Sequence, residues 1–498
     1  MNPLLKVKIW NKEVGRLMWH NGRHTSYFTY NPDFLNGDID IAPLAASIKA
    51  TSSRFPIYGE NERIYQKLPS FLADSLPDSW GNLVFERWRI ENNIRNTDIT
   101  PIEKLAFIGK RGMGALEFEP ETEREDYATT LELKSLISLA EKIAKEREQV
   151  HIFPDESLTM QALISVGTSA GGRQPKAIVS INKQTGEIRS GQIQQPEEYD
   201  YYILKFGDDA RSLSETEQTF TEMAKMAGIE TAESRLLNVG GTNHFLSKRF
   251  DRNGTNKIHC QTLAAMDPEA DSYEKLLTVC RKLNLGEPTC EQLFRRMVFN
   301  ILANNTDDHN KNFTFLMTPN NKWRLSPAYD ITYIYDRGGY LPNQQHCLTA
   351  LGKLEDFTQK DMISFAERNG IRKAASIINN VKESILSFKS LAEKNEVKKE
   401  WIGRIENGLK DNLNVFEDKH EVAVGGVNTT IENNVVDSIV IEAVYKGNYH
   451  LIATIEGRSR KYIIRKGTPE HDAITQTGIS NLTDDYKAQL VKKFILSK

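Results

Sequence analysis

Two short stretches of the sequence decide its interpretation: NNTDDHNKNFTFL over residues 304–316 and WRLSPAYD over residues 323–330. The first carries Asp307 and, five residues later, Asn312 in a polar loop, and it then continues into an apolar strand. The second is a further short strand that ends shortly before Asp330. A loop, a hairpin and a final carboxylate can therefore bring three oxygen-bearing side chains together.

The helix predicted before this loop has the clearest pattern in the chain. Apolar side chains recur at helical spacing over residues 289–304. Thr289 and Gln292 follow Pro288 with the spacing of a capping box, which predicts that the helix begins there. This helix would deliver the chain directly into the polar loop.

The order of these residues is that of the catalytic loop of protein kinases, with an Asp, an Asn five positions later and an Asp after a short hairpin. In that layout Asp307 accepts the proton of the attacking hydroxyl group. Asn312 and Asp330 hold Mg²⁺ against the phosphates of ATP, because hard cations prefer oxygen ligands. Loops rich in Asp and Asn are also common as plain turns, so other residues must decide between the two interpretations.

Two upstream features complete the kinase order. The glycine-rich stretch over residues 167–176, GTSAGGRQPK, could let backbone N–H groups approach phosphate, although a plain hairpin loop has the same pattern and no Walker A motif is present. Lys205 lies in the apolar strand YYILKF, where an ammonium group needs an anion or an exposed face. Glu217 begins a helical pattern further on and could pair with Lys205. The whole set favours phosphoryl transfer.

Composition excludes several classes of protein. The chain has 498 residues, of which 39% are hydrophobic and 26% charged, so a collagen-like, coiled-coil or largely disordered chain is excluded. With 64 basic and 67 acidic residues the net charge is −3, which argues against a protein that binds nucleic acid by itself. Four cysteines without a CxxC pair, and no secretory or membrane-spanning pattern, predict a cytoplasmic globular protein.

Changes of pattern along the chain predict an α+β protein with a two-lobed, protein-kinase-like fold in four parts. Residues 1–120 form a β-rich N-terminal subdomain that starts with a small antiparallel sheet. Residues 121–250 form the kinase N-lobe with connecting helices, the glycine-rich loop and the strand lysine. Residues 251–415 form an all-helical catalytic C-lobe. Residues 416–498 form an extra small α+β module whose role stays open between binding a substrate, binding an antitoxin and packing on the helical lobe.

At these motifs the sequence resembles the HipA family, the serine/threonine-kinase toxins of bacterial type II toxin–antitoxin systems. The resemblance extends over roughly residues 4–415, and the segments that carry it are KIWNKEVGRL, FLADSLPDSWG, ISVGTSAGGRQPKA, YYILKF, ETEQTFTEMAKMAGI, LSKRFDR, NTDDHNKNF and RLSPAYDI. It implies ATP and Mg²⁺ as cofactors and a protein substrate. In the best-known member the substrate is a glutamyl-tRNA synthetase, whose phosphorylation arrests translation and growth. It also implies a HipB-like helix-turn-helix antitoxin, with DNA bound only through that partner, and no membrane.

The resemblance also assigns residues by position. Asp307 is the proton acceptor, Asn312 and Asp330 are the metal ligands, and Lys205 contacts the α- and β-phosphates with Glu217 as its supporting ion pair. The other nucleotide-binding residues that it implies are Gly167, Thr168, Ser169, Ala170, Gly171, Gly172, Lys176, Lys248, Arg249, Phe250, His309, Asn310, Lys311 and Tyr329, besides Asn312 and Asp330 themselves.

Two departures concern regulation and the catalytic loop. Ser165 matches the autophosphorylated serine of the family, whose phosphate would expel the loop from the ATP site. Because the loop is longer and richer in small residues than in the best-known toxin, Ser169 is an alternative. Asp308 stands where that toxin has glycine, and its carboxylate could bind metal or shift the pKa of its neighbour.

Two other functions stay open. The first is a nucleotide-binding pseudokinase or transcriptional corepressor that acts with a DNA-binding antitoxin, although the complete set of Lys205, Asp307, Asn312 and Asp330 argues against it. The second is a small-molecule phosphotransferase, because sugar and antibiotic phosphotransferases use a similar loop. The LPDSWG segment of the N-terminal subdomain argues against this second function.

Overall fold

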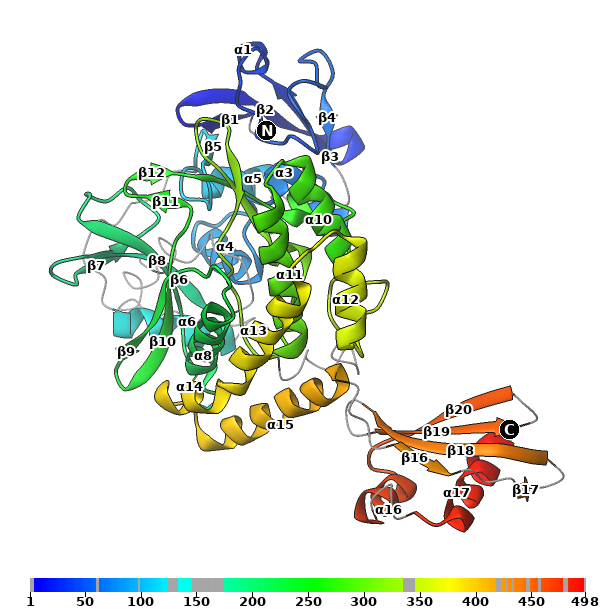
Figure 1. Ribbon diagram of the computed structural model, residues 1–498. Coiled ribbons are helices and arrows are strands. Elements are labelled where there is room, and N and C mark those ends of the chain that lie inside the picture. Colours follow the sequence, from blue (N-terminus) through cyan, green and yellow to red (C-terminus); the bar gives the residue numbers. More distant parts are fainter. Residues whose placement is uncertain are drawn as a thin grey trace.

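The chain forms several sheets and helices around four apolar cores, as far as the described residues show. No helix among them has the length and apolarity that crossing a membrane requires. The computed structural model (Figure 1) describes residues 4–59, 62–96, 99–122, 133–145, 163, 174–208, 210–334, 345–417, 422–425, 429–431, 434–444, 448–455, 458–477 and 482–496.

The N-terminal part contains an antiparallel sheet with the strand order β4-β3-β2-β1-β5. Its inward side chains alternate with exposed ones, as expected for a sheet with one buried face. This confirms the small antiparallel sheet expected after residue 4. The strands are β1 (Leu5–Ile9), β2 (Lys12–His20), β3 (Thr25–Tyr30), β4 (Ile57–Tyr58) and β5 (Leu116–Glu119).

Within the described residues five helices accompany this sheet, and a side chain caps the N-terminus of α1, α4 and α5. The Asp78 carboxylate accepts a hydrogen bond of 2.6 Å from Gly81 N at the start of α4. Thr100 and Glu103 form the capping box of α5. The helices are α1 (Pro32–Leu35), α2 (Glu62–Tyr65), α3 (Ser70–Ala73), α4 (Ser79–Glu91) and α5 (Pro101–Ile108).

A second antiparallel sheet follows, with the strand order β7-β6-β8-β10-β9. The register of β6 against β8 sets Lys176 opposite Lys205. Trp80 and Phe85 of α4 share an apolar core with the inner faces of β6 and β8. The elements are α6 (Leu133–Lys145), β6 (Lys176–Asn182), β7 (Ile188–Ser190), β8 (Tyr199–Lys205), α8 (Leu213–Met226), β9 (Ser234–Val239) and β10 (Thr242–Lys248).

The next part is mainly helical and has the largest core. It is not all-helical, which corrects the expectation for residues 251–415: the predicted hairpin β14–β15 gains a third strand, β13, from a segment too short to identify by pattern. The elements are β11 (Arg252–Asn253), β12 (Asn256–Lys257), β13 (His259–Thr262), α9 (Leu263–Met266), α10 (Tyr273–Lys282), α11 (Glu287–Leu302), β14 (Thr314–Met317), β15 (Trp323–Leu325), α12 (Gln359–Arg368), α13 (Ala374–Leu386), α14 (Phe388–Lys394) and α15 (Lys399–Phe416).

Helix α11 confirms the predicted apolar helix, but the predicted capping box is wrong. The helix begins at Glu287, two residues before Thr289, and Gly286 is its N-cap residue at φ +79°. Pro288 fits the first turn because that turn needs no intrahelical N–H donor there. The Gln292 side chain instead binds the 228–230 segment, donating to Gly228 O (2.9 Å) and accepting from Glu230 N (3.2 Å).

The C-terminal residues form the α+β module that the sequence predicts, with a core of their own. In Figure 1 the module lies beyond the end of α15. Its sheet has the order β16-β18-β19-β20, and β17 also pairs with β18. The elements are β16 (Val422–Gly425), β17 (Thr429–Ile431), β18 (Asn434–Val444), β19 (Asn448–Ile455), β20 (Arg458–Ile464), α16 (Pro469–Thr477), α17 (Asp484–Val491) and a π-helical turn, Lys492–Leu496.

His259 on β13 makes the stability of this fold depend on pH. The ring is buried, packs against Trp323 and has Nε2 3.4 Å from Ile41 O, and burial lowers its pKa to about 4. The unfolded chain, with a pKa near 6.5, therefore binds the proton first as pH falls. We expect the wild type to lose up to about 3 kcal/mol of stability between pH 6.5 and pH 4 from this group.

The measurement is the urea midpoint at several pH values for wild type and His259→Gln. The variant cannot titrate, so its midpoint should fall less steeply below pH 6.5 than that of the wild type. Parallel curves for the two proteins would contradict a neutral, buried His259.

Candidate active site

Asp307 lies in the loop between α11 and β14 with an accessible carboxylate. Its side chain is 56% exposed, and the His309 Nε2 atom lies 3.9 Å from Asp307 Oδ2. Asn312, in the short helical turn that ends this loop, donates from Nδ2 to the main-chain oxygen of Asp307 at 2.8 Å. The Asn312 side-chain amide thus fixes the loop, while the exposed Asp307 carboxylate can contact a hydroxyl group of another molecule.

Lys205 joins three elements through its ammonium group. Lys205 Nζ on β8 is 2.5 Å from Glu217 Oε1 on α8, and it also contacts Asp330 Oδ1, which follows β15. Asp330 has a left-handed backbone conformation, φ +53°, which Asp tolerates better than most residues. The structure therefore brings together the strand lysine, the helix glutamate and the aspartate after the hairpin.

The charges of Lys205, Asp330 and Glu217 shift one another's pKa values. Burial opposes the charge of Lys205, but Asp330 and Glu217 outweigh it and raise the pKa of the ammonium group. Burial also opposes the charge of Asp330, yet Lys205 and Lys176 lower the pKa of this carboxyl group. Burial, with a contribution from Asp330, raises the pKa of Glu217. Asp330 is accordingly the carboxylate best prepared to bind a cation.

The residues expected around the nucleotide separate into two groups. A small hollow is lined by Asn312, Tyr329 and Asp330 among others. The Tyr329 hydroxyl donates to Lys311 O at 2.8 Å, and its ring lies 5.5 Å from that of Phe250. These aromatic rings offer an apolar face next to the polar ligands.

The second group consists of expected nucleotide-binding residues whose side chains contact other parts of the protein. Lys248 Nζ pairs with Asp200 at 2.8 Å, and Asn310 Nδ2 donates to Ala270 O at 3.1 Å. The Arg249 side chain has no exposed surface and is paired with Asp251 at 2.7 and 2.8 Å. Its guanidinium group is thus part of the protein interior, although the resemblance assigns it to the nucleotide.

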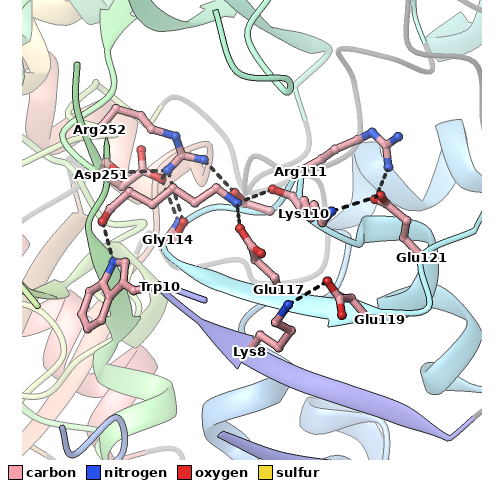
Figure 2. Close-up of polar contacts among 12 residues, drawn as sticks. Lys8, Trp10, Lys110, Arg111, Gly114, Glu117, Glu119, Glu121, Asp251 and Arg252 are labelled. Carbon is pink, nitrogen blue, oxygen red and sulfur yellow. Dashed lines mark hydrogen bonds and ion pairs between the residues drawn. The ribbon is translucent and has the colours of Figure 1, made fainter. Parts of the chain in front are cut away.

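The Arg249–Asp251 pair belongs to a network that connects the N-terminal part with the segment after β10. Asp251 Oδ2 also accepts from Gly114 N at 2.7 Å and from Arg252 at 2.6 Å. Burial opposes the charge of Asp251, but Arg249 and Arg252 lower the pKa of its carboxyl group. Figure 2 shows Gly114, Asp251 and Arg252 of this network together with the Trp10 indole, which donates to Lys257 O at 2.8 Å.

The glycine-rich loop lies outside the described residues, so its assignments stay predictions. Lys176, which ends the glycine-rich stretch, is described: it begins β6, is 2% exposed, and has Nζ 3.4 Å from Asp78 Oδ2. The predicted residues that lie outside the described ranges are Ser165, Gly167, Thr168, Ser169, Ala170, Gly171 and Gly172.

Asp308 turns away from the site, unlike its neighbour Asp307. Its carboxylate is fully buried and accepts from the Tyr273 hydroxyl at 2.6 Å and from Cys347 N at 2.7 Å. His346 Nδ1 lies 2.9 Å from the same group. The expectation that Asp308 binds metal is therefore not supported, because its oxygens are occupied by three partners inside the protein.

Arg296 is a buried residue that sequence reasoning did not identify. It lies on α11 and donates from Nη2 to Ser326 O at 2.6 Å, four residues before Asp330. Burial lowers the pKa of its guanidinium group to about 10. A charged residue within the apolar pattern of residues 289–304 was the available signal. Arg296 fixes the segment that presents Asp330.

The donor set suits a magnesium ion shared with phosphate. Within the described part of the chain, no group of three His, Cys, Asp or Glu side chains could hold a metal ion alone. Asn312 and Asp330 provide an amide oxygen and an ionised carboxylate around one hollow, because the Asn312 nitrogen is used by Asp307 O. Mg²⁺ typically takes one or two such ligands and completes its shell with water and substrate phosphates.

Comparisons with known proteins agree with this geometry. A family model described as HipA N-terminal domain matches residues 5–119, and one described as HipA-like C-terminal domain matches residues 168–388. The serine/threonine-protein kinase toxin HipA of Shewanella oneidensis is 22% identical over 358 residues, which cover 66% of this chain and 75% of the toxin. A Haemophilus influenzae protein described as a kinase is 24% identical over 283 residues, 47% of this chain and 78% of that protein.

A solved structure supports the fold. The complex of HipA, HipB and operator DNA from Shewanella oneidensis contains a chain that matches with a TM-score of 0.58 at 16% identity. The match covers 83% of this chain and 97% of that chain. The expected two-lobed, kinase-like α+β fold is therefore confirmed.

The buried Asp308 contacts generate a stability prediction. Asp308→Ala leaves the Tyr273 hydroxyl and Cys347 N without their acceptor, so we expect a loss of about 3 kcal/mol in the free energy of unfolding. Asp308→Asn keeps one acceptor oxygen and should lose less. Urea unfolding of both variants measures the effect.

Asp271→Asn is the matched control, because the Asp271 side chain is 75% exposed in the same lobe. It should match the wild type. An Asp308→Ala variant as stable as this control would show that the interior contacts of Asp308 contribute nothing.

Proposed function

The chain belongs to the HipA family, and on that premise we propose that it is a Mg-ATP-dependent serine/threonine protein kinase. The observation that carries the proposal is the contact of Lys205 with both Glu217 and Asp330, next to a loop that presents Asp307 and Asn312. Glu217 keeps the lysine aligned, and Asp330 belongs to the metal side of the site. A protein that used this fold only for binding would not need all of these groups.

Each of these residues has its own role in the proposed reaction. Asp307 accepts the proton of a serine or threonine hydroxyl while that oxygen attacks the γ-phosphate. Lys205 binds the α- and β-phosphates, and the rings of Phe250 and Tyr329 pack against the adenine base. Asn312 and Asp330 would hold Mg²⁺, which neutralises the phosphate charge when it is bound.

The biological role follows from the family. We propose that the substrate is a cytoplasmic protein whose phosphorylation arrests translation and growth, and that it belongs to the aminoacyl-tRNA synthetases, with glutamyl-tRNA synthetase as the first candidate. A HipB-like antitoxin is the proposed partner, because the HipA of Shewanella oneidensis forms a complex with HipB and operator DNA. DNA would then be bound through the partner.

Removal of the proposed base tests the chemistry. Asp307→Ala should lower transfer of ³²P from Mg-ATP to protein by about 10²- to 10⁴-fold, the usual contribution of a general base. ATP binding should persist, because Asp307 is not proposed as a nucleotide ligand. Asp271→Asn, which removes an exposed carboxylate of the same lobe, should behave as the wild type.

Three outcomes would contradict the proposal. Labelling by Asp307→Ala at the wild-type rate would remove Asp307 from the mechanism. Wild-type ATP binding without transfer to any protein would favour the pseudokinase, and preferential transfer to a small molecule would favour the phosphotransferase.

Phosphoproteomics can identify the acceptor. Brief expression of the wild type, compared with Asp330→Ala, should yield one dominant phosphorylated host protein and a phosphate on Ser165 or Ser169 of the chain itself. The kinase-inactive variant should yield neither. A phosphorylated host protein outside translation would contradict the proposed class of substrate, and an unmodified Ser165 and Ser169 would contradict autoregulation.

A further inference from the structure

One carboxylate of the N-terminal part reaches the phosphate side of the site. Asp78 belongs to the LPDSWG segment and lies before α4. Its Oδ1 atom accepts from Gly81 N at 2.6 Å, and its Oδ2 atom lies 3.4 Å from Lys176 Nζ. The two oxygens thus serve different elements, one the helix and the other a strand of the kinase part, 98 residues away in the sequence.

Trp80 holds the other end of the same lysine. Its indole Nε1 donates to the main-chain oxygen of Lys176 at 2.9 Å, and its ring is almost fully buried against Ala177 and Val179. Both the backbone and the side chain of Lys176 are therefore fixed by a segment of the N-terminal part. A helix that needed only a cap would not require either contact.

Lys176 lies among the charged groups of the active site. It is the last residue of the glycine-rich stretch and the first residue of β6, and the sheet register sets it opposite Lys205. The charged groups that act on it are Asp78 from α4, Asp330 from the segment after β15, and Lys205 from β8, and its own charge acts on Glu217 of α8. A buried ammonium group is costly without such a partner.

We propose that Asp78 is a positioning residue of the active site, which holds the Lys176 ammonium beside Lys205 and Asp330 so that two lysines face the phosphates of ATP. This inference rests on the proposed kinase function. It makes the nucleotide site a joint product of both HipA domains, because the N-terminal domain supplies the group that keeps Lys176 in place. A partner that displaces α4 would then weaken phosphate binding without touching the nucleotide.

Substitutions of Asp78 can separate its effect on Lys176 from its role as the N-cap of α4. Asparagine caps helices about as well as aspartate, so Asp78→Asn keeps the hydrogen bond to Gly81 and removes only the charge that faces Lys176. Asp78→Glu keeps a charge with a longer reach. Glu86→Gln is the matched control, because Glu86 lies on the helix that Asp78 caps and pairs with Arg89 instead of Lys176.

The test measures Mg-ATP and adenosine affinities of the full-length protein by calorimetry. Asp78→Asn should weaken Mg-ATP binding about ten-fold, equivalent to about 1.4 kcal/mol, and leave adenosine binding unchanged because adenosine carries no phosphate. Asp78→Glu should recover part of the loss, and Glu86→Gln should match the wild type. Lys176→Met should reproduce the selective loss even if Asp78→Asn does not fold.

The possible failures are distinguishable. A wild type that binds no Mg-ATP contradicts the proposed function itself. A wild type that binds Mg-ATP, with unchanged affinity in both Asp78→Asn and Lys176→Met, overturns the positioning role. Equal losses for Mg-ATP and adenosine also overturn it, because they indicate that Asp78 acts only on the general structure.

Discussion

The arrangement of the candidate active site depends on the two ion pairs of the Lys205 ammonium group. This group is the one positive charge that contacts Glu217 of α8 and Asp330 beyond β15, among the ion pairs of the described residues. These carboxylates come from different lobes of the kinase fold. Since a buried carboxylate without a partner costs several kcal/mol, Glu217 depends on the Lys205 ammonium group, which also pairs with Asp330. Lys205 therefore joins α8 to the segment after β15 at the proposed phosphate site.

The N-terminal domain is joined to the rest of the protein by several hydrogen bonds. Tyr65 and Ser70 donate to the main-chain oxygens of Ala264 and Ala265 at 2.9 and 3.0 Å. Asp74 accepts two hydrogen bonds from Thr262, of 2.7 and 2.8 Å. Burial raises the pKa of Asp74. Together with the Asp251 network of Figure 2, these contacts attach the N-terminal helices to the segment that precedes α10.

The sequence could predict the elements whose pattern lies within a short stretch of the chain. The hairpin before Asp330, the strand with Lys205 and the apolar helix before the polar loop all follow from spacing within about twenty residues, and the structure contains them. It could not predict where Asp308 points. Its partners Tyr273 and Cys347 are 35 and 39 residues away, and no local pattern relates them.

Burial explains the remaining differences. Arg249 lies at the end of β10 in a motif assigned to the nucleotide, yet the backbone there directs its side chain inward, where Asp251 neutralises it. The capping box expected for α11 fails for a related reason, since Gly286 and Pro288 already define the first turn. For Arg249 the buried ion pair with Asp251 prevails over the local motif, and at α11 the Gln292 side chain binds Gly228 O and Glu230 N in place of a cap.

The balance of charge in the site favours a metal–nucleotide complex over free ATP. Two lysines, Lys176 and Lys205, face three carboxylates, Asp78, Glu217 and Asp330, so the formal charge is negative before Asp307 is added. A free triphosphate would meet net repulsion there, whereas a magnesium-bound triphosphate brings cation and anion together. The carboxylates then attract the metal and the ammonium groups attract the phosphates, so each half of the ligand is bound by the group of opposite charge. In the proposed kinase, an asymmetric site of this kind would orient the γ-phosphate before Asp307 acts as the base.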